Sequence, residues 1–501
     1  MKTIVLRNTV RGAALGFTLL LATGARADLA ISSGATQNVS CAAGVCTATA
    51  KKAVLNVNDL TAMLAAGDAT VKSGSLAQDI DIKAAINWTS ASRLTLDSYH
   101  SISFEKPVIV SGSSGALTIT TNDGGFGGNF IFVGNGHVEY PDVTADLSRL
   151  VINGIQYQLA KSSKGISRKF RFHGYDHYVA LAKSYNAAKE GVHSSPIIGE
   201  LDGVFEGLGN AISNLSIDNT SAGLVGFVGK TDERSAVIRD LNLVNASVTA
   251  GERAGSVGAL VGSVLAESGQ YNVFRCSATG QVTAGGNYNA GGLVGSSEGR
   301  ILQSQANVDI VAGNDSEAGG LVGHNSLGYV DQSYAAGSVV GGDNSSVGGL
   351  VGGEENPITN SYAQGPATGG GNSNVGGLVG SISEVSGIST SYSIGYVTGG
   401  TGTTLGGFIG LDDGPPGKFF ANYWDLDTSG IDDPAQGIGN IPNAPGVTGL
   451  TDAQLKSALP DGFDPKVWGQ NPNINNGYPY LLANPPPKNA PGKRSPKFRA
   501  R

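Results

Sequence analysis

The sequence predicts an all-β protein whose main part is a β-solenoid, a rod of stacked coils. Three observations lead to this prediction. The phrase GGLVG, with small variations, returns seven times between Gly223 and Gly410, at intervals of 28 to 36 residues. Glycine contributes 76 of 501 residues, about twice its usual share. Short runs of Val, Leu and Ile are separated by Gly, Ser and Asn, a pattern typical of short strands and tight turns.

Residues 1–27 have the features of a secretory signal peptide. A basic start is followed by a short apolar run, Ala13 to Ala22, and by a small-x-small cleavage site, Ala25-Arg26-Ala27. We therefore expect a mature chain beginning at Asp28, secreted or displayed at the cell surface, with no transmembrane segment after cleavage.

Residues 28–169 are predicted to be an N-terminal β-helical region of short strands, for example Arg93 to Leu96 and Ala116 to Thr120. One helix is expected from Asn58 to Ala65, with Asn58 as its cap. Asn153-Gly154 stands between short apolar runs and predicts a hairpin.

Residues 170–195 are predicted to be a helical junction. No glycine or proline interrupts Asp176 to Glu190, and Gly191 follows as a stop signal. A repeat solenoid is then expected over 196–410, with coils of about 28 residues.

Five repeat units align on Ser277, Ser304, Ser333, Ser361 and Ser391. Leu and Val of GGLVG, together with a large apolar residue before each serine, are expected to fill the interior. The paired glycines are expected at corners that need close backbone approach.

Tyrosines recur at one position of the coil: Tyr334, Tyr362, Tyr392 and Tyr423. They allow two interpretations. A row of tyrosines on one face can bind a sugar or polymer, and the same row can instead stack and stabilise the rod. They are the candidate ligand-binding residues.

Residues 411–484 are expected to cap the last coil, with a short helix from Leu450 to Leu459 capped by Thr451. Residues 485–501 hold six basic and no acidic residues and are expected to be a disordered tail. The formal charge is −7, and without the signal and the tail it is near −17. Such an acidic body argues against nucleic acid as a partner.

Cys41 and Cys46 are close enough to form a disulfide in an oxidising compartment, whereas Cys276, inside a repeat, fits a buried small side chain. His173 and His177 lack the glutamate of a zinc-protease motif, and Gly295 to Gly299 matches G-x-S-x-G without the expected helix.

A weak calcium-loop pattern is formed by four oxygen-bearing side chains, but the residue in the twelfth place is Gln436 instead of glutamate. These candidates are Asp425, Asp427, Ser429 and Asp433. We expect no cofactor and no catalytic residues.

The GGLVG phrase, with a Ser-Tyr strand between its copies, resembles the GLUG-motif repeats of bacterial secreted proteins. The stretch from Asp79 to Gly125 is similar to a β-helical segment of filamentous-haemagglutinin-type exoproteins. The resemblance implies a right-handed parallel β-helix, export from a Gram-negative cell and a role in attachment. It also implies an outer-membrane secretion transporter as a possible partner.

The sequence thus predicts an adhesin-like binding protein that makes multivalent contacts with a host-cell or matrix glycan or protein, without a catalytic step. The alternatives are a polysaccharide-active or sugar-binding β-helix protein and a passive structural spacer.

Overall fold

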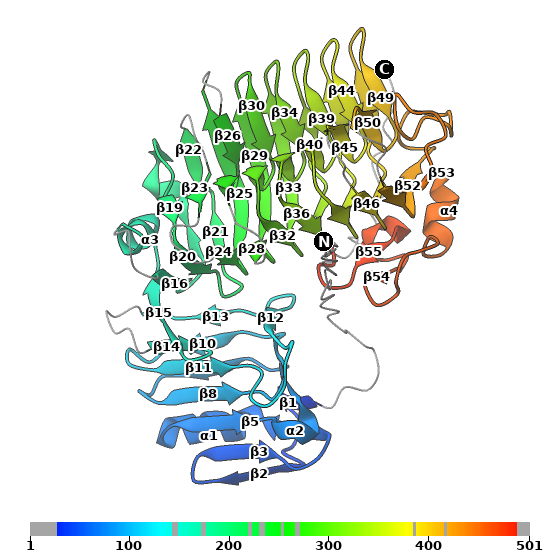
Figure 1. Cartoon of the computed structure of the whole chain (residues 1–501). Coiled ribbons are helices and arrows are strands. Elements are labelled where there is room, and N and C mark those ends of the chain that lie inside the picture. Colours follow the sequence, from blue (N-terminus) through cyan, green and yellow to red (C-terminus); the bar gives the residue numbers. More distant parts are fainter. Residues whose placement is uncertain are drawn as a thin grey trace, which may run out of the picture.

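The computed structural model describes residues 28–142, 149–171, 177–218, 223–229, 236–251, 255–265, 271–383, 387–414 and 418–487. The predicted signal peptide, the basic residues from Lys488 onward and His173 lie outside these ranges. The fold is all-β, built on long parallel sheets (Figure 1). No helix among the described residues is long and apolar enough to cross a membrane.

The N-terminal block has three sheet faces. One is a 5-stranded sheet, in the order β12 (Phe130–Phe132), β9 (Ile102–Phe104), β6 (Asp79–Ile82), β1 (Asp28–Ser32) and β4 (Lys52–Asn56). The second is β13 (Val138–Glu139), β10 (Val108–Val110) and β7 (Ile86–Trp88). The third belongs to a 16-stranded sheet, here called the long sheet, which continues into the repeat block.

The long sheet runs β2 (Val39–Ala42), β3 (Val45–Ala48), β5 (Ala69–Lys72), β8 (Arg93–Asp97), β11 (Ala116–Thr120), β14 (Leu150–Ile152), β15 (Ile155–Ala160), β16 (His177–Leu181), β20 (Gly203–Glu206), β24 (Val237–Arg239), β28 (Tyr271–Phe274), β32 (Arg300–Leu302), β36 (Tyr329–Asp331), β41 (Ile358–Thr359), β46 (Gly387–Ser389) and β51 (Lys418–Phe420).

The repeat block adds three further sheets. The tyrosine sheet has 15 strands: β17 (Tyr185–Asn186), β21 (Ala211–Ser213), β25 (Asn242–Ala250), β29 (Ser277–Ala284), β33 (Gln305–Ala312), β37 (Tyr334–Ala335), β42 (Tyr362–Ala363), β47 (Tyr392–Ser393), β52 (Asn422–Asp425) and β53 (Val447–Leu450), with β18 (Val192–His193), β22 (Ser216–Asp218), β38 (Val339–Val340), β43 (Ala367–Gly369) and β48 (Val397–Gly399) beside that path.

Two corner sheets complete the coils. The first has 8 strands: β19 (Ile198–Leu201), β23 (Val225–Val228), β27 (Val261–Val264), β31 (Val294–Ser297), β35 (Val322–Asn325), β40 (Val351–Glu354), β45 (Val379–Ile382) and β50 (Ile409–Asp412). The second has 6: β26 (Gly255–Gly258), β30 (Tyr288–Gly291), β34 (Glu317–Gly319), β39 (Ser346–Gly348), β44 (Asn374–Gly376) and β49 (Thr404–Gly406).

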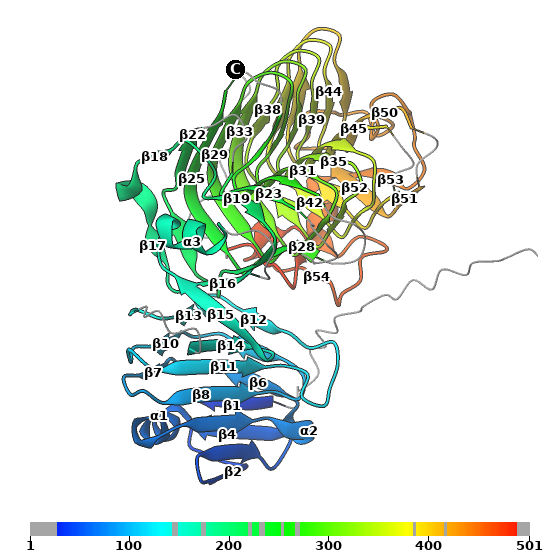
Figure 2. The same ribbon diagram turned by 60° about the vertical axis from the view of Figure 1, so that its left-hand side comes forward.

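The open end of the N-terminal block is covered by the antiparallel β2–β3 hairpin and by helix α1 (Val57–Ala66). These elements lie at the bottom of Figure 2. The expected helix is confirmed, but Asn56 caps it instead of Asn58, because the Asn56 side chain accepts a hydrogen bond from the Asn58 amide at 2.8 Å. A second short helix is α2 (Gly74–Ala77).

The chain reverses direction between the blocks. β14 and β15 pair antiparallel through Asn153 and Gly154, both at positive φ, so the predicted hairpin is confirmed. The strands on either side of this hairpin remain in the long sheet. One sheet therefore runs through both blocks, although the strands change direction where the blocks meet.

The helix predicted over Asp176 to Glu190 is wrong. From His177 onward this stretch forms β16, β17 and the 3-10 turn η2 (Ala187–Glu190), while helix α3 (Ser163–Lys169) precedes it. β16 is held between β15 and β20, and its Val179 and Leu181 are buried. Pairing on both edges overrides the helix-like spacing of the apolar residues.

From the second phrase onward, each GGLVG-type phrase forms a sharp corner between the two corner sheets, and its two apolar residues lie in the core as predicted. A Cβ on Gly348 would lie 1.8 Å from the Val351 carbonyl oxygen, and one on Gly349 would lie 2.2 Å from that of Gly377. Backbone packs on backbone at this corner, so only glycine fits, and this accounts for the recurrence of the phrase.

A ladder of buried hydroxyls runs inside the coils. The Ser333 hydroxyl accepts the Ser304 amide at 3.1 Å and donates to the Asp331 carbonyl at 2.9 Å, and Ser361 and Ser391 repeat this arrangement. Gln332, just before Ser333, has φ 49°. The hydroxyl therefore satisfies an amide where the left-handed residue interrupts the strand ladder.

The alignment of Ser277 with this ladder is wrong by one residue. Cys276 takes the ladder position, since its amide donates to the Ser304 hydroxyl at 3.1 Å, while Ser277 pairs with Gln305. The irregular register between β25 and β29 at Leu243 and Ala246 lies in this coil. Cys276 is buried, as expected, and burial raises the pKa of its thiol to about 12.

The C-terminal region has two parts. Trp424, Ile431 and Ile438 join the core and close the last coil. Residues 451–487 then run back along the tyrosine sheet (Figure 1), which differs from the expectation that they cover the open end. This segment, here called the cover, contains α4 (Asp452–Ser457), β54 (Trp468–Gly469), η3 (Asn475–Gly477) and β55 (Tyr480–Leu481). The predicted helix and its Thr451 cap are confirmed.

Candidate functional site

The four candidate tyrosines form one column on the outer side of β37, β42, β47 and β52. The rings of Tyr334 and Tyr362 stack at 4.6 Å and those of Tyr362 and Tyr392 at 5.0 Å, each pair only 5° from parallel. Stacked rings place their faces against each other. Sugars stack on ring faces, so the column offers a ligand little more than ring edges.

The cover buries this column. Trp468, Phe463 and Leu481 pack on it, and none of the four tyrosines is more than 9% exposed. The Tyr392 hydroxyl donates to the Pro479 carbonyl at 2.6 Å. The interpretation of Tyr334, Tyr362, Tyr392 and Tyr423 as an exposed binding row is therefore wrong for this structure, and the stacking interpretation holds.

The calcium-loop residues are engaged in other interactions. Asp425 is buried, with Oδ2 2.8 Å from the Tyr478 hydroxyl, and burial raises the pKa of this carboxyl. Asp427 accepts the Asp452 amide, Asp433 accepts the Ala435 amide, and the Ser429 hydroxyl donates to the Ile431 carbonyl. Within the described residues no group of three His, Cys, Asp or Glu side chains could hold a metal. These four side chains therefore stabilise turns and attach the cover to the tyrosine sheet.

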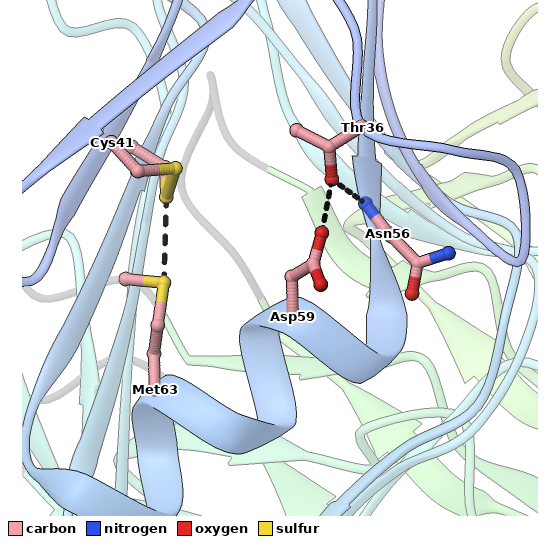
Figure 3. The surroundings of a disulfide bond; sticks show 6 residues. Thr36, Cys41, Asn56, Asp59 and Met63 are labelled. Carbon is pink, nitrogen blue, oxygen red and sulfur yellow. Dashed lines mark hydrogen bonds between the residues drawn. A yellow bond between two sulfur atoms is a disulfide. The ribbon is translucent and has the colours of Figure 1, made fainter.

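Cys41 and Cys46 are joined at 2.04 Å across the β2–β3 hairpin (Figure 3). The Met63 sulfur of α1 lies 3.6 Å from the Cys46 sulfur. The Thr36 hydroxyl links Asn56, which caps this helix, to Asp59 in its first turn. The disulfide thus belongs to the N-terminal cap.

The remaining motifs also have structural partners. His177 Nδ1 lies 3.0 Å from Asp202 Oδ1, and both side chains are buried. Ser297, the serine of the G-x-S-x-G match, is buried and donates to the Gly299 carbonyl at 3.1 Å. Neither arrangement resembles an activated nucleophile.

A different surface carries an uncovered, repeated arrangement of polar groups. The outward side chains of the two corner sheets approach each other: the Ser381 hydroxyl donates to that of Ser346 at 2.9 Å, and a Cβ on Gly353 would lie 2.6 Å from Glu317 Oε1. Outer faces that meet in this way enclose a concave angle. We call this surface the polar corner.

The polar corner has one residue per coil on each side. On the 6-stranded sheet these are Ser256, Asn289, Glu317, Ser346, Asn374 and Thr404. On the 8-stranded sheet they are Ser263, Ser296, His324, Gly353, Ser381 and Leu411. All but the buried Gly353 are half-exposed, and most carry a hydroxyl or an amide. The sequence shows the corner glycines, but it does not show which outward residues face each other.

Three ionisable groups meet midway along the polar corner. His324 Nδ1 lies 2.6 Å from Glu317 Oε2, and His324 Nε2 lies 3.8 Å from Glu355 Oε1. The close contact with the Glu317 carboxylate raises the pKa of His324 above its usual 6.5. The Ser383 hydroxyl donates to Glu355 at 3.3 Å. Sequence analysis missed this group because its members come from different coils.

Comparison with known proteins adds little. No family model matches the chain. A stretch of 194 residues is 31% identical to halomucin of Haloquadratum walsbyi, and the match covers 37% of this chain but only 2% of halomucin. A crystal structure described as that of a putative immunoglobulin A1 protease from Bacteroides ovatus is 19% identical, with a TM-score of 0.39, over 66% of this chain and 92% of that chain. Neither similarity assigns a family or an activity.

Proposed function

We propose that this chain is a secreted or surface-displayed, adhesin-like binding protein whose coils form a right-handed parallel β-helix. It makes multivalent contacts with a glycan or protein of a host cell or matrix and performs no chemical step. The GLUG-like phrases and the haemagglutinin-like segment support this proposal. They also support export through an outer-membrane transporter.

The polar corner is the observation that carries the proposal. It has two facing columns over six coils, and eight of its twelve residues carry a hydroxyl or an amide. Successive coils lie about 4.8 Å apart, so a linear ligand along the corner meets a new pair of side chains at each step. Individually weak contacts then add to a useful affinity.

A polysaccharide-active protein is the second candidate. The convergence of Glu317, His324 and Glu355 favours it, since acid and base groups in one concave surface are what glycan chemistry needs. A passive spacer would use neither the corner nor these groups.

The test is binding of the mature chain, Asp28 to Arg501, to a glycan and matrix-protein array, with the eluted ligands checked for cleavage. Asn289→Arg and Asn374→Arg narrow the polar corner and are expected to abolish binding. Gln281→Arg, on the exposed face of β29, is the matched control and should leave binding unchanged. Cleavage of the ligand would support the polysaccharide-active candidate. Unchanged binding by both corner variants would show that the binding face lies elsewhere.

A further inference from the structure

The repeat block is unusually poor in positive charge around the polar corner. Residues 271–417 contain eleven Asp and Glu, two arginines and no lysine. Arg275 is held by Asp240 at 2.6 Å, and the Arg300 guanidinium lies 5.8 Å from the Tyr329 ring centre on the long sheet. Acidic residues therefore outnumber basic ones in this part of the chain, and this favours cationic over anionic ligands.

Of the carboxylates in this part of the chain, Glu317 belongs to the polar corner and Glu355 lies beside it, next to His324. The side chains of Glu317 and Glu355 are 33% and 30% exposed, on either side of the same imidazole. Glu317 Oε2 is used by His324, whereas Glu317 Oε1 lies over Gly353. Glycine leaves room for this carboxylate, because a Cβ there would lie 2.6 Å from Oε1 and 2.9 Å from Oε2.

On this basis we propose that the polar corner binds a linear glycan with free primary ammonium groups, a glucosamine polymer, and that Glu317 and Glu355 receive the ammonium. This inference rests on the proposed function and names its ligand class. Hydroxyl and amide side chains above and below the carboxylates suit the hydroxyls of neighbouring sugar units. Among the twelve residues of the polar corner, Leu411 is the one large apolar side chain available to the side chains of a cationic peptide.

Pairing of the ammonium with the two carboxylates predicts how the affinity depends on acetylation and on salt. An ammonium in contact with a half-exposed carboxylate gains a charge-assisted hydrogen bond, and salt weakens this gain. A glucosamine hexamer is expected to bind the mature chain at least about 10-fold more tightly than an N-acetylglucosamine hexamer, at pH 6.5 and low salt. The difference should shrink as sodium chloride is added.

Calorimetry with both hexamers tests the proposal. Glu317→Gln and Glu355→Gln should each remove about 10-fold of affinity for the glucosamine hexamer and so reduce its preference over the acetylated hexamer. Asp309→Asn removes the same charge from the exposed face of β33 and serves as the control, with no effect expected. Gly353→Ala should displace the Glu317 carboxylate and lower the affinity for the glucosamine hexamer. Since that carboxylate ends a flexible side chain, the melting temperature should stay close to wild type.

The outcomes distinguish failure of the ammonium proposal from failure of the proposed binding function. Equal binding of the two hexamers would overturn the ammonium proposal and leave the glycan-binding function standing. Binding of neither hexamer overturns this proposal, and a positive glycan array would then still support the broader function. A lysine hexamer that binds as tightly, with the same dependence on Glu317, would overturn the choice of a glycan and point to a cationic protein segment.

Discussion

Gly348→Ala tests whether backbone packing at the corner is what makes the repeated phrase necessary. The added Cβ would lie 1.8 Å from the Val351 carbonyl oxygen, 2.7 Å from the Gly380 amide nitrogen and 2.8 Å from the Leu378 carbonyl oxygen. All three atoms belong to the backbone, so no side chain can rotate away. The corner must open by about 1.6 Å, the difference between this 1.8 Å distance and an ordinary contact of 3.4 Å.

Opening the corner has a calculable cost. Overpacking typically costs about 1–3 kcal/mol. The shift also strains the bonds across coils from the Gly349 amide to the Gly376 carbonyl at 3.2 Å and from the Leu350 amide to the Leu378 carbonyl at 2.8 Å. Each such bond contributes about 1 kcal/mol. We therefore expect a loss of about 3–5 kcal/mol, concentrated in the coils on either side because neighbours share stability in a solenoid.

Gly371→Ala is the control in the same block. Its Cβ would have no neighbour closer than 3.4 Å, and Gly371 is not at positive φ. It should be neutral or stabilising by up to about 1 kcal/mol, because alanine reduces the entropy of the unfolded chain. Urea unfolding followed by circular dichroism, with hydrogen exchange resolved by coil, measures both variants. If the two differ by less than about 1 kcal/mol, the close-packed corner is not the reason for the glycine.

Three further predictions follow from the ladder, the ionisable group and the cover. Ser333→Ala leaves the Ser304 amide without its partner inside the core, so urea unfolding should show a loss of about 1–3 kcal/mol. Glu317→Gln should lower the pKa of His324 in an NMR titration, and an unchanged titration would contradict the assignment. Because the pKa of His324 is raised in the folded state, the pair stabilises the fold fully below about pH 6.5. This stabilisation is lost as the pH rises through the pKa of His324 in the folded protein. Trp468→Ala should lower the free energy of unfolding by about 3–5 kcal/mol and make the cover sensitive to protease. The coils should stay protected in hydrogen exchange. Loss of that protection would show that the cover and the solenoid unfold together.

The sequence by itself determined the period, the buried Leu and Val of each phrase, the corner glycines, the Asn153-Gly154 hairpin and the Thr451-capped helix. These features arise from local chemistry: turn residues, apolar spacing and capping are visible within a few residues. The serine ladder was visible too, apart from the coil where an irregular register moved Cys276 into its place.

Only the tertiary structure decided which surface is covered and which is free. The tyrosine column and the cover are dozens of residues apart, and nothing in their local pattern indicates that Trp468 packs on Tyr362. The helix expected before Glu190 became strands because β15 and β20 provide backbone partners on both sides of β16. The meeting of Glu317, His324 and Glu355 likewise depends on how successive coils align. The periodic sequence therefore determines the repeated coil, while contacts between distant segments determine which faces of the coils are exposed to solvent.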